Sequence, residues 1–355
     1  MKIALVGNWP RPYGGVSVHV AALARALRTL GIDVRVLDIG EGDHECEGVV
    51  PARGVLRYAS ALAAVAAEGR LVHLHTNGAN VKSWLVALAA GRARHPRAPR
   101  GVLTLHSGSA PAFLRGGAER RRLAAAACAG FGRVIAVNDE IAAELFAAGV
   151  PANRVSVLPP FSPAVLERVD PPAAFTAFRA AHAPVLAAAL LPLPLYGADL
   201  LLEAFAALRR RHPRAGLALF GQGTQAPELR APGVLGLGEI AHGEALGVLE
   251  ASDVFVRPTR ADGDSVSVRE ALALGCRVVA SDVGHRPPGC ELFPAGDGSA
   301  LAAVLEVAAA GARPGPRAPP EDPFDAIVEA YRSLAAGRPA GHRSGGCAPA
   351  ERLRR

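Results

Sequence analysis

The sequence predicts an α/β protein built from two doubly wound, Rossmann-like domains. Three observations indicate this fold: short apolar runs alternate with helical patterns, the alternation restarts after a proline-containing segment at residues 159–163, and 355 residues suffice for two cores. Alternating strands and helices are typical of a parallel sheet covered by helices on both faces. Such sheets place ligands at the carboxyl ends of their strands.

The first domain is expected over residues 1–163. It opens with the strand-length apolar run KIALVG at residues 2–7, then a turn-rich loop through Gly14 and Gly15, then a helix that stops at Gly31. Further strands are predicted at residues 34–39, 71–75, 101–106, 133–137 and 154–158. We expect His73 and His75 to occupy alternate faces of one of these strands, and we assign them no catalytic role.

The second domain is expected over residues 164–322. Strands are predicted at residues 184–191, 217–221, 254–258 and 277–282, with a helix at residues 199–211 and another that begins near Ser265. One last helix, at residues 323–335, is expected to pack back on the first domain. The Gly-, Pro- and Arg-rich tail at residues 337–355 is expected to be disordered.

The net charge of +7 is unevenly distributed. Residues 1–163 carry +8, residues 164–336 carry −5 and the tail carries +4, so the first domain is the one expected to meet an anionic partner. We expect residues 115–133, with Arg115 and the run Arg120, Arg121 and Arg122 beside Ala and Leu, to contact an anionic membrane surface, although an ordinary solvated helix face is the alternative. Nucleic-acid binding is disfavoured because the Arg clusters have no interleaved aromatic residues.

Cysteine usage and hydropathy predict a cytoplasmic protein, with peripheral contact at the inner face of the membrane. The five cysteines show no metal-ligand spacing, which favours a reducing compartment. The opening apolar run is too short for a signal peptide, and the uncharged stretch at residues 183–198 is too short to span a bilayer. The loop after the first strand, GNWPRPYGG, lacks the GxGxxG fingerprint, which disfavours a hydride-transfer enzyme.

The most informative segment is residues 254–284. A strand ends at Pro258, a polar loop with Asp262, Gly263 and Asp264 follows, and a helix then begins with Glu270 one turn inside it. Helix N-termini offer free backbone N–H groups that suit a phosphate or a sugar hydroxyl.

These motifs resemble a known family, the retaining GT-B glycosyltransferases of the family 4 group (glycosyl transferases group 1). The resemblance runs nearly end to end: the early GG loop, LTLHSG around His106, LFGQG, the stretch LGLGEIAHGEALGVLEASDVFVRPT, and Asp262 followed eight positions later by Glu270 in REALALGCRVVASDVG. It implies two Rossmann-like domains that face each other across a cleft. It also implies sugar transfer from a nucleotide-diphosphate donor to a saccharide or lipid-linked acceptor, in bacterial envelope, exopolysaccharide or related glycan synthesis, without a metal cofactor.

The resemblance also implies roles for individual residues. Glu270 would accept hydrogen bonds from the donor ribose, Asp262 would contact the transferred sugar, and His106 would lie beside the anomeric carbon. The resemblance places Gly14 and Gly15 at the donor diphosphate, Gly221 and Gly223 at the nucleotide, and the turn with Gly238 and Ile240 at the base. The remaining implied donor-binding residues form the loop after Asp262: Gly263, Asp264, Ser265, Val266 and Ser267.

Each of these features has a structural alternative. Ser267 and Glu270 have the spacing of a helix capping box, Asp262 and Asp264 suit a turn, Gly14–Gly15 suits a plain turn, and His106 suits a structural histidine. Asp262-Gly-Asp264 also matches a DxD metal motif. We reject a metal site there because the doubled α/β layout favours GT-B, which requires no metal.

The chain departs from the family at one motif. The family has GRxxxxKG early in its second domain, and here Leu191 and Tyr196 stand where its Arg and Lys are expected. Three explanations remain. The preferred one is that other cations substitute, with Arg260, Arg269 and Arg286 as candidates. Alternatively, the leaving group differs, or the protein binds sugars without transferring them. A catalytically silent GT-B-like sugar-binding protein and a nucleotide-sugar 2-epimerase are therefore the alternative functions.

Overall fold

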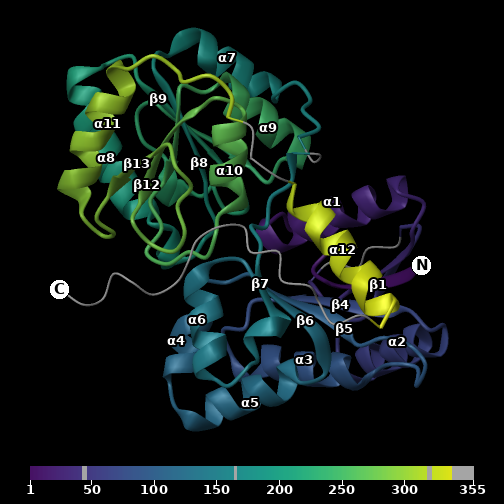
Figure 1. Ribbon diagram of the computed structural model, residues 1–355. Coiled ribbons are helices and arrows are strands. Elements are labelled where there is room, and N and C mark those ends of the chain that lie inside the picture. The colour runs from purple at the N-terminus through teal and green to yellow at the C-terminus, as the bar shows by residue number, and fades with distance from the viewer. Residues whose placement is uncertain (42–45, 164–165, 318–321, 338–355) are drawn as a thin grey trace.

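The computed structural model describes residues 1–41, 46–163, 166–317 and 322–337 (Figure 1). It contains a seven-stranded and a six-stranded parallel sheet, each flanked by helices, and so confirms the predicted α/β fold class. The tail predicted at residues 337–355 lies outside these residues from residue 338 onward. No helix within the described ranges is long and apolar enough to cross a membrane.

The first sheet has the strand order β3-β2-β1-β4-β5-β6-β7. Its strands are β1 (Lys2–Gly7), β2 (Asp33–Asp38), β3 (Val49–Pro51), β4 (Leu71–Thr76), β5 (Gly101–Leu105), β6 (Phe131–Ala136) and β7 (Val155–Val157). Its helices are α1 (Gly15–Thr29), α2 (Val55–Ala67), α3 (Val81–Arg92), α4 (Ala110–Arg115), α5 (Ala118–Cys128) and α6 (Asp139–Ala147). Alternate residues of β1 enter two different core clusters, Ile3 and Leu5 in one and Ala4 and Val6 in the other, so both faces of the sheet are buried.

The second sheet has the strand order β10-β9-β8-β11-β12-β13. Its strands are β8 (Val185–Ala189), β9 (Gly216–Phe220), β10 (Val234–Gly238), β11 (Val254–Arg257), β12 (Arg277–Ser281) and β13 (Cys290–Phe293). Its helices are α7 (Ala173–Ala181), α8 (Ala198–Arg211), α9 (His242–Ala251), α10 (Val266–Ala273) and α11 (Gly298–Ala310). Two core clusters again cover its two faces.

The last helix, α12 (Pro323–Ala335), lies beside α1 and over the first sheet (Figure 1). Phe324, Ile327, Val328 and Tyr331 are buried in the core cluster that contains Ile3 and Leu5. The Tyr331 hydroxyl also shares a hydrogen bond with Nδ1 of His73. The C-terminal helix therefore completes the core of the first domain.

The expectation that His73 and His75 lie on alternate faces of their strand is wrong. Residues two apart on a strand share a face. Both histidines are buried in β4, and their ring centroids are 4.0 Å apart.

The two domains meet along the carboxyl ends of their strands. In both sheets the strand order reverses at one point, between β1 and β4 in the first and between β8 and β11 in the second. The Asn138 side-chain amide donates to the Gly263 carbonyl at 3.1 Å, and the Tyr13 backbone N–H donates to Glu239 at 2.8 Å. These contacts join the carboxyl edges of the two sheets, and open α/β sheets bind ligands at this edge.

Candidate active site

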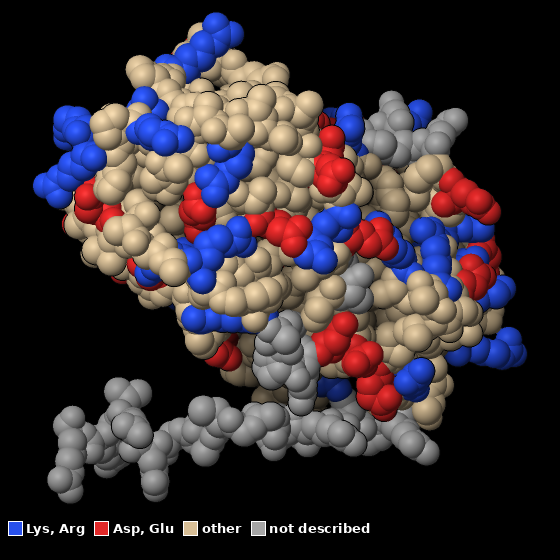
Figure 2. Space-filling view, turned by 90° about the horizontal axis from the view of Figure 1, so that it is seen from above, with Lys and Arg blue, Asp and Glu red and all other residues tan. Residues whose placement is uncertain are grey.

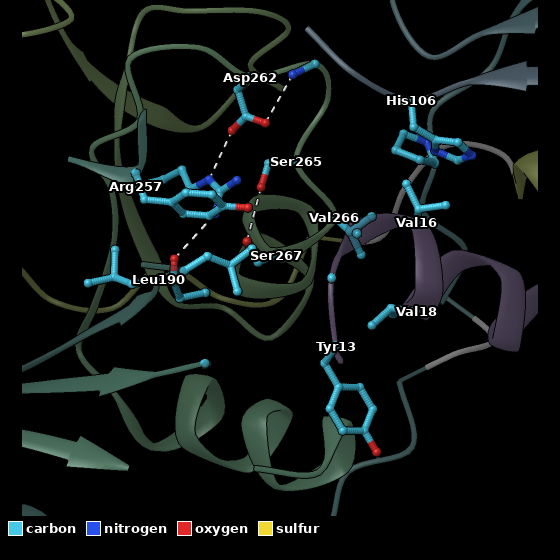
Figure 3. A pocket seen from close by; sticks show the side chains of 18 of the residues that line it. Tyr13, Val16, Val18, His106, Leu190, Arg257, Asp262, Ser265, Val266 and Ser267 are labelled. Atoms are coloured by element: carbon cyan, nitrogen blue, oxygen red, sulfur yellow. Dashed lines mark hydrogen bonds and ion pairs between the residues drawn. The ribbon is translucent and has the colours of Figure 1, made fainter. Parts of the chain in front are cut away.

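A cavity of about 450 Å³ lies between the two domains and is called the cleft cavity below. Residues that follow β1, β4 and β5 line it from the first domain, and residues that follow β8, β9, β10 and β11 line it from the second. Val16 and Val18 of α1 lie near Val266, at the start of α10, in the lining of this cavity (Figure 3), and all three belong to one apolar cluster. The volume and the position suit a small polar ligand held by both domains.

Most of the site residues predicted from the sequence line the cleft cavity. These are Gly14, Gly15, His106, Gly221, Ile240, Asp262, Gly263, Asp264, Ser265, Val266, Ser267 and Glu270. Gly223 lines a neighbouring cavity of about 430 Å³ instead. Gly238 lies behind the lining, where its carbonyl accepts a hydrogen bond of 2.8 Å from the Gly221 N–H. Leu191 and Tyr196, which stand where Arg and Lys were expected, both line the cleft cavity.

Glu270 comes from the second turn of α10 and is 5% exposed. The capping-box alternative for this residue is wrong, because the N-cap is Ser265 and the Glu270 carboxylate instead accepts a hydrogen bond of 2.6 Å from Nε2 of His242. Burial opposes protonation of His242, but the charge of Glu270 and the hydrogen bond to it outweigh this effect and raise the pKa of His242. Glu270 is thus a buried acceptor held in place by the hydrogen bond from His242 of α9.

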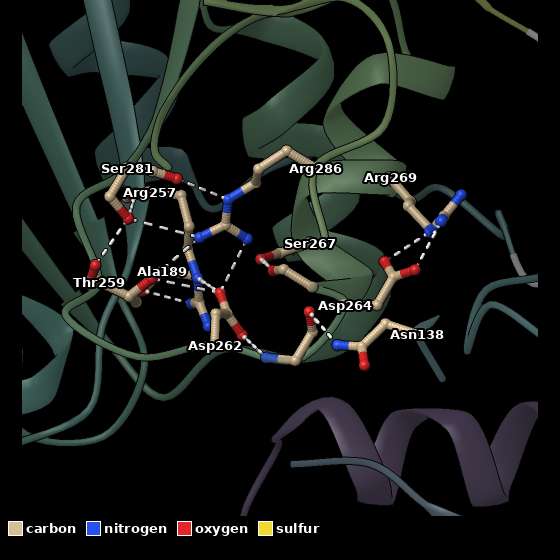
Figure 4. A network of polar contacts seen from close by, with 12 residues as sticks. Asn138, Ala189, Arg257, Thr259, Asp262, Asp264, Ser267, Arg269, Ser281 and Arg286 are labelled. Atoms are coloured by element: carbon tan, nitrogen blue, oxygen red, sulfur yellow. Dashed lines mark hydrogen bonds and ion pairs between the residues drawn. The ribbon is translucent and has the colours of Figure 1, made fainter. Parts of the chain in front are cut away.

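Asp262 lies between two arginines (Figure 4). Its Oδ2 accepts from Nε of Arg257 at 3.0 Å and from Nη1 of Arg286 at 3.1 Å, while its Oδ1 accepts from the Gly263 N–H. Burial alone would raise the pKa of Asp262, but the charges of Arg257 and Arg286 hold it below its usual value. The side chain is therefore an ionised, fixed acceptor at the edge of the cavity.

Asp264 is held by Arg269 through two hydrogen bonds of 2.6 Å each. Desolvation raises the pKa of Asp264 despite this pairing, because its side chain is almost fully buried. The aspartates of the Asp262-Gly263-Asp264 motif are thus both engaged by arginine, and a metal ion would have to displace these partners to bind them.

The His106 side chain lies at the floor of the cleft cavity, next to His19 and His75. One ring nitrogen from each of His19, His75 and His106 lies within 4.8 Å of the others. Among the described residues, these three histidines are close enough to one another to hold a metal ion. Nδ1 of His19 donates to the Pro160 carbonyl at 2.8 Å, and His75 and His106 share a hydrogen bond of 3.1 Å. Burial lowers the pKa of all three rings, that of His19 to about 4, so His106 presents a neutral imidazole to the cavity.

The three arginines predicted to replace the missing cations do not line the cleft cavity. Arg260 pairs with Asp199 and lines the neighbouring cavity, Arg269 is held by Asp264, and Arg286 lies behind Asp262. Arg257, which was not predicted, is the one Arg or Lys among the described residues that line the cleft cavity. The sequence does hold an indication of this role, because Arg257 is a basic residue at the carboxyl end of the otherwise apolar strand VFVR.

Comparison with protein families agrees with this geometry. The model for Glycosyltransferase Family 4 matches residues 13–161, and the model for Glycosyl transferases group 1 matches residues 184–310. The chain belongs to the GT-B glycosyltransferases of the family 4 group. The two family matches correspond to the two domains that enclose the cleft cavity.

Solved structures share the fold of this glycosyltransferase at low sequence identity. HepE of Anabaena, in complex with UDP and glucose, is 19% identical with a TM-score of 0.65, over 96% of this chain and 95% of that one. Sucrose-phosphate synthase from Thermosynechococcus elongatus is 19% identical with a TM-score of 0.62, over 95% and 96%. A putative UDP-N-acetylglucosamine 2-epimerase from Listeria monocytogenes is 14% identical with a TM-score of 0.65, over 96% and 98%. No curated protein sequence matches the chain.

Proposed function

We propose that this protein transfers a sugar from a nucleotide-diphosphate donor to a saccharide or lipid-linked acceptor, with retention of the anomeric configuration. The observation that carries the proposal is Glu270, a buried carboxylate that lines the cleft cavity beside the N-terminus of α10. One oxygen accepts from His242. A carboxylate has two acceptor oxygens, so the second suits paired ribose hydroxyls. Bound UDP and UDP-glucose in the similar HepE structures support a nucleotide-sugar donor.

The donor diphosphate would lie between the N-termini of α1 and α10. Gly14 and Gly15 line this part of the cavity, and an added Cβ on Gly14 would meet no atom within 4 Å, so the backbone faces open space. Two helix N-termini that converge on one cavity stabilise an anion through their free N–H groups and dipoles. We propose that Asp262 orients the sugar and that neutral His106 lies at its reacting face.

Nucleotide-sugar binding is tested first with a thermal-shift panel of UDP-, GDP-, ADP- and CMP-sugars, followed by a hydrolysis assay on each hit. We expect Glu270→Ala to lower affinity for the donor by about 100-fold or more, because it removes a charged hydrogen-bond acceptor from a buried site. Glu203→Ala, at an exposed position of α8, is the matched control and should bind like the wild type. Full activity in the Glu270 variant would refute the proposal.

Two alternatives give different outcomes in the same assay. A 2-epimerase, the class suggested by the similar Listeria structure, converts the sugar nucleotide without an acceptor and yields an epimer. A catalytically silent sugar-binding protein gives a thermal shift but no product. A glycosyltransferase releases nucleoside diphosphate, faster with acceptor present, and the product keeps the donor's anomeric configuration by NMR.

We also propose that the reaction needs no metal, and that the protein acts in the cytoplasm in envelope, exopolysaccharide or related glycan synthesis. The arginine partners of Asp262 and Asp264 support metal-independence, because they occupy the carboxylates that a DxD metal site would use. EDTA should leave the turnover unchanged. A loss of activity that Mn²⁺ or Mg²⁺ restores would count against this part of the proposal.

A further inference from the structure

The loop after β8 leaves the cleft cavity without the cations expected there. Leu191 and Tyr196 line the cavity at this point, and neither side chain carries a positive charge at neutral pH. A diphosphate that departs with two or more negative charges needs fixed donors close to it. In acyl transfer, the loss of a single donor to a developing oxyanion slows the reaction by about 10²–10³-fold.

Arg257 reaches the same region from the neighbouring strand. β11 pairs in parallel with β8, so both strands end at the same edge of the sheet. Nη1 of Arg257 lies 3.4 Å from the carbonyl oxygen of Ala189, the last residue of β8, and the guanidinium carbon lies 5.0 Å from the centre of the Tyr196 ring. The Arg257 guanidinium therefore lies against the ring of Tyr196, the residue at the position where the family has its lysine.

The cluster of Asp262, Arg257 and Arg286 carries two positive charges and one negative charge. Asp262 shares its single negative charge between Arg257 and Arg286, whereas Asp264 is paired one to one with Arg269. All three nitrogens of Arg286 donate to protein oxygens, and Arg286 does not line the cavity. Arg257 has five N–H groups, and its partners among the described residues are Asp262, the Ala189 carbonyl and the Tyr196 side chain, so it retains donors for a ligand.

We infer that Arg257 binds the donor diphosphate and stabilises it as a leaving group, in place of the Arg and Lys missing from the β8 loop. This inference rests on the proposed function. In the transfer, the bond between the sugar C1 and the diphosphate oxygen breaks and its electron pair stays on that oxygen. The acceptor hydroxyl oxygen bonds to C1, and its proton passes to the diphosphate. Arg257 stabilises the negative charge that grows on the diphosphate, and Asp262 and Tyr196 hold the guanidinium in position.

The test compares diphosphate with monophosphate binding. We expect Arg257→Leu to weaken binding of UDP, GDP or ADP, whichever the wild type prefers, by about 10- to 100-fold while the matching monophosphate binds as before. Turnover should fall by about 10²–10³-fold. Arg260→Leu, three residues further along the chain but on the neighbouring cavity, is the control and should change neither quantity. Equal losses in the two variants, or unchanged diphosphate affinity in Arg257→Leu, would overturn the inference.

A rescue variant separates charge from structure, because Arg257 also holds Asp262. Adding Leu191→Arg and Tyr196→Lys to Arg257→Leu returns cations to the cavity from the loop after β8. We expect the turnover of this triple variant to be at least tenfold higher than that of Arg257→Leu alone. No recovery, with a circular dichroism spectrum like that of the wild type, would show that the charge is not what Arg257 supplies. A wild type that binds none of the nucleotides refutes the proposed function itself. A wild type that binds them, with an unaffected Arg257 variant, refutes only this inference.

Discussion

Gly108 shows how closely the two domains approach each other at the site. A Cβ added to this residue would lie 1.7 Å from the carbonyl oxygen of Asp262, and one added to Gly263 would lie 2.6 Å from the carbonyl oxygen of His106. Backbone from the first domain thus presses directly on the loop that carries Asp262. No side chain fits between the two segments without moving one domain against the other.

Gly108→Ala is therefore predicted to open the cleft. We expect donor affinity and turnover to fall by at least tenfold, with a smaller loss of thermal stability, because the added methyl group displaces one of the two loops. Gly315→Ala is the control, since a Cβ there meets nothing within 4 Å. Isothermal titration with the best donor of the panel measures the effect, and wild-type affinity in Gly108→Ala would contradict the prediction.

At the same scale, the candidate site was predictable where its residues are close in sequence. Asp262, Ser265 and Glu270 fall within one strand–loop–helix segment, so their spacing alone places them on one edge of a sheet. The partners that tune them come from elsewhere: His242 lies 28 residues from Glu270 and Asn138 lies 125 residues from Gly263. Arg257 was missed because proximity to the motif in sequence does not show which arginines reach the cavity and which are held by aspartates.

At the scale of elements, the strands that the sequence failed to predict are β3, β10 and β13, which are three of the four sheet edges. Central strands are apolar on both faces and read clearly from sequence, as β1, β4 and β8 do. Edge strands are covered less completely and carry a weaker pattern. β3 has only three residues, and β10 contains two glycines, which have a low strand propensity.

The helix α12 gives a prediction at this scale. Ile327 is 1% exposed in the core cluster of the first sheet, although almost the whole second domain separates it from that sheet in sequence. We expect Ile327→Ala to lower the free energy of unfolding of the first domain by about 2–5 kcal/mol. Both tryptophans, Trp9 and Trp84, belong to that domain, so urea unfolding followed by tryptophan fluorescence measures it. Exposed Glu329→Ala is the control; equal stability in both variants would show that α12 contributes little.

At the scale of the whole molecule, the charge distribution can be compared with the sequence, and on the face drawn in Figure 2 opposite charges are interspersed. In the segment expected from the sequence to contact an anionic membrane, residues 115–133, several charges are paired. Arg115 pairs with Glu140 and Glu144, and Arg121 lies 3.5 Å from Glu144. Arg120 stacks 5.0 Å over the Phe113 ring, and Arg122 is exposed. Arg120 and Arg122 are therefore the exposed arginines of α5 for which the described residues offer no ion pair.

This distribution predicts weak, salt-sensitive binding to anionic vesicles. Each basic residue near such a surface contributes about 1 kcal/mol, so Arg120→Glu with Arg122→Glu should weaken binding by at least tenfold. Sedimentation with vesicles of phosphatidylglycerol and phosphatidylcholine measures this, and Arg210→Glu in the second domain is the control. Binding to pure phosphatidylcholine, or none to the anionic vesicles, would count against a membrane role for this segment.

The buried histidines predict how the stability of the molecule depends on pH. Burial lowers the pKa of His19, His73, His75 and His106 below the ordinary value of 6.5, that of His19 to about 4. Below pH 6.5 the unfolded chain therefore binds more protons than the folded chain, and the free energy of unfolding falls as the pH drops. His242 has the opposite sign: its raised pKa adds stability at low pH that is lost as the pH rises through the folded value.

Because the pKa is lowered for four histidines and raised for one, the protein is expected to lose stability between pH 6.5 and pH 5. At pH 5 the loss is on the order of 2 kcal/mol for each ring that stays neutral in the folded protein. Urea unfolding at pH 5 and pH 7, followed by the fluorescence of the two first-domain tryptophans, reports on the domain that holds all four rings. His19→Asn should lose less stability on acidification than the wild type, by about 2 kcal/mol, because an amide cannot take up the proton that the unfolded histidine gains. His95→Asn, at a partly exposed surface position, is the control. The same pH dependence in His19→Asn as in the wild type would show that the ring is protonated within the fold and that the cluster is not the neutral floor of the cleft cavity.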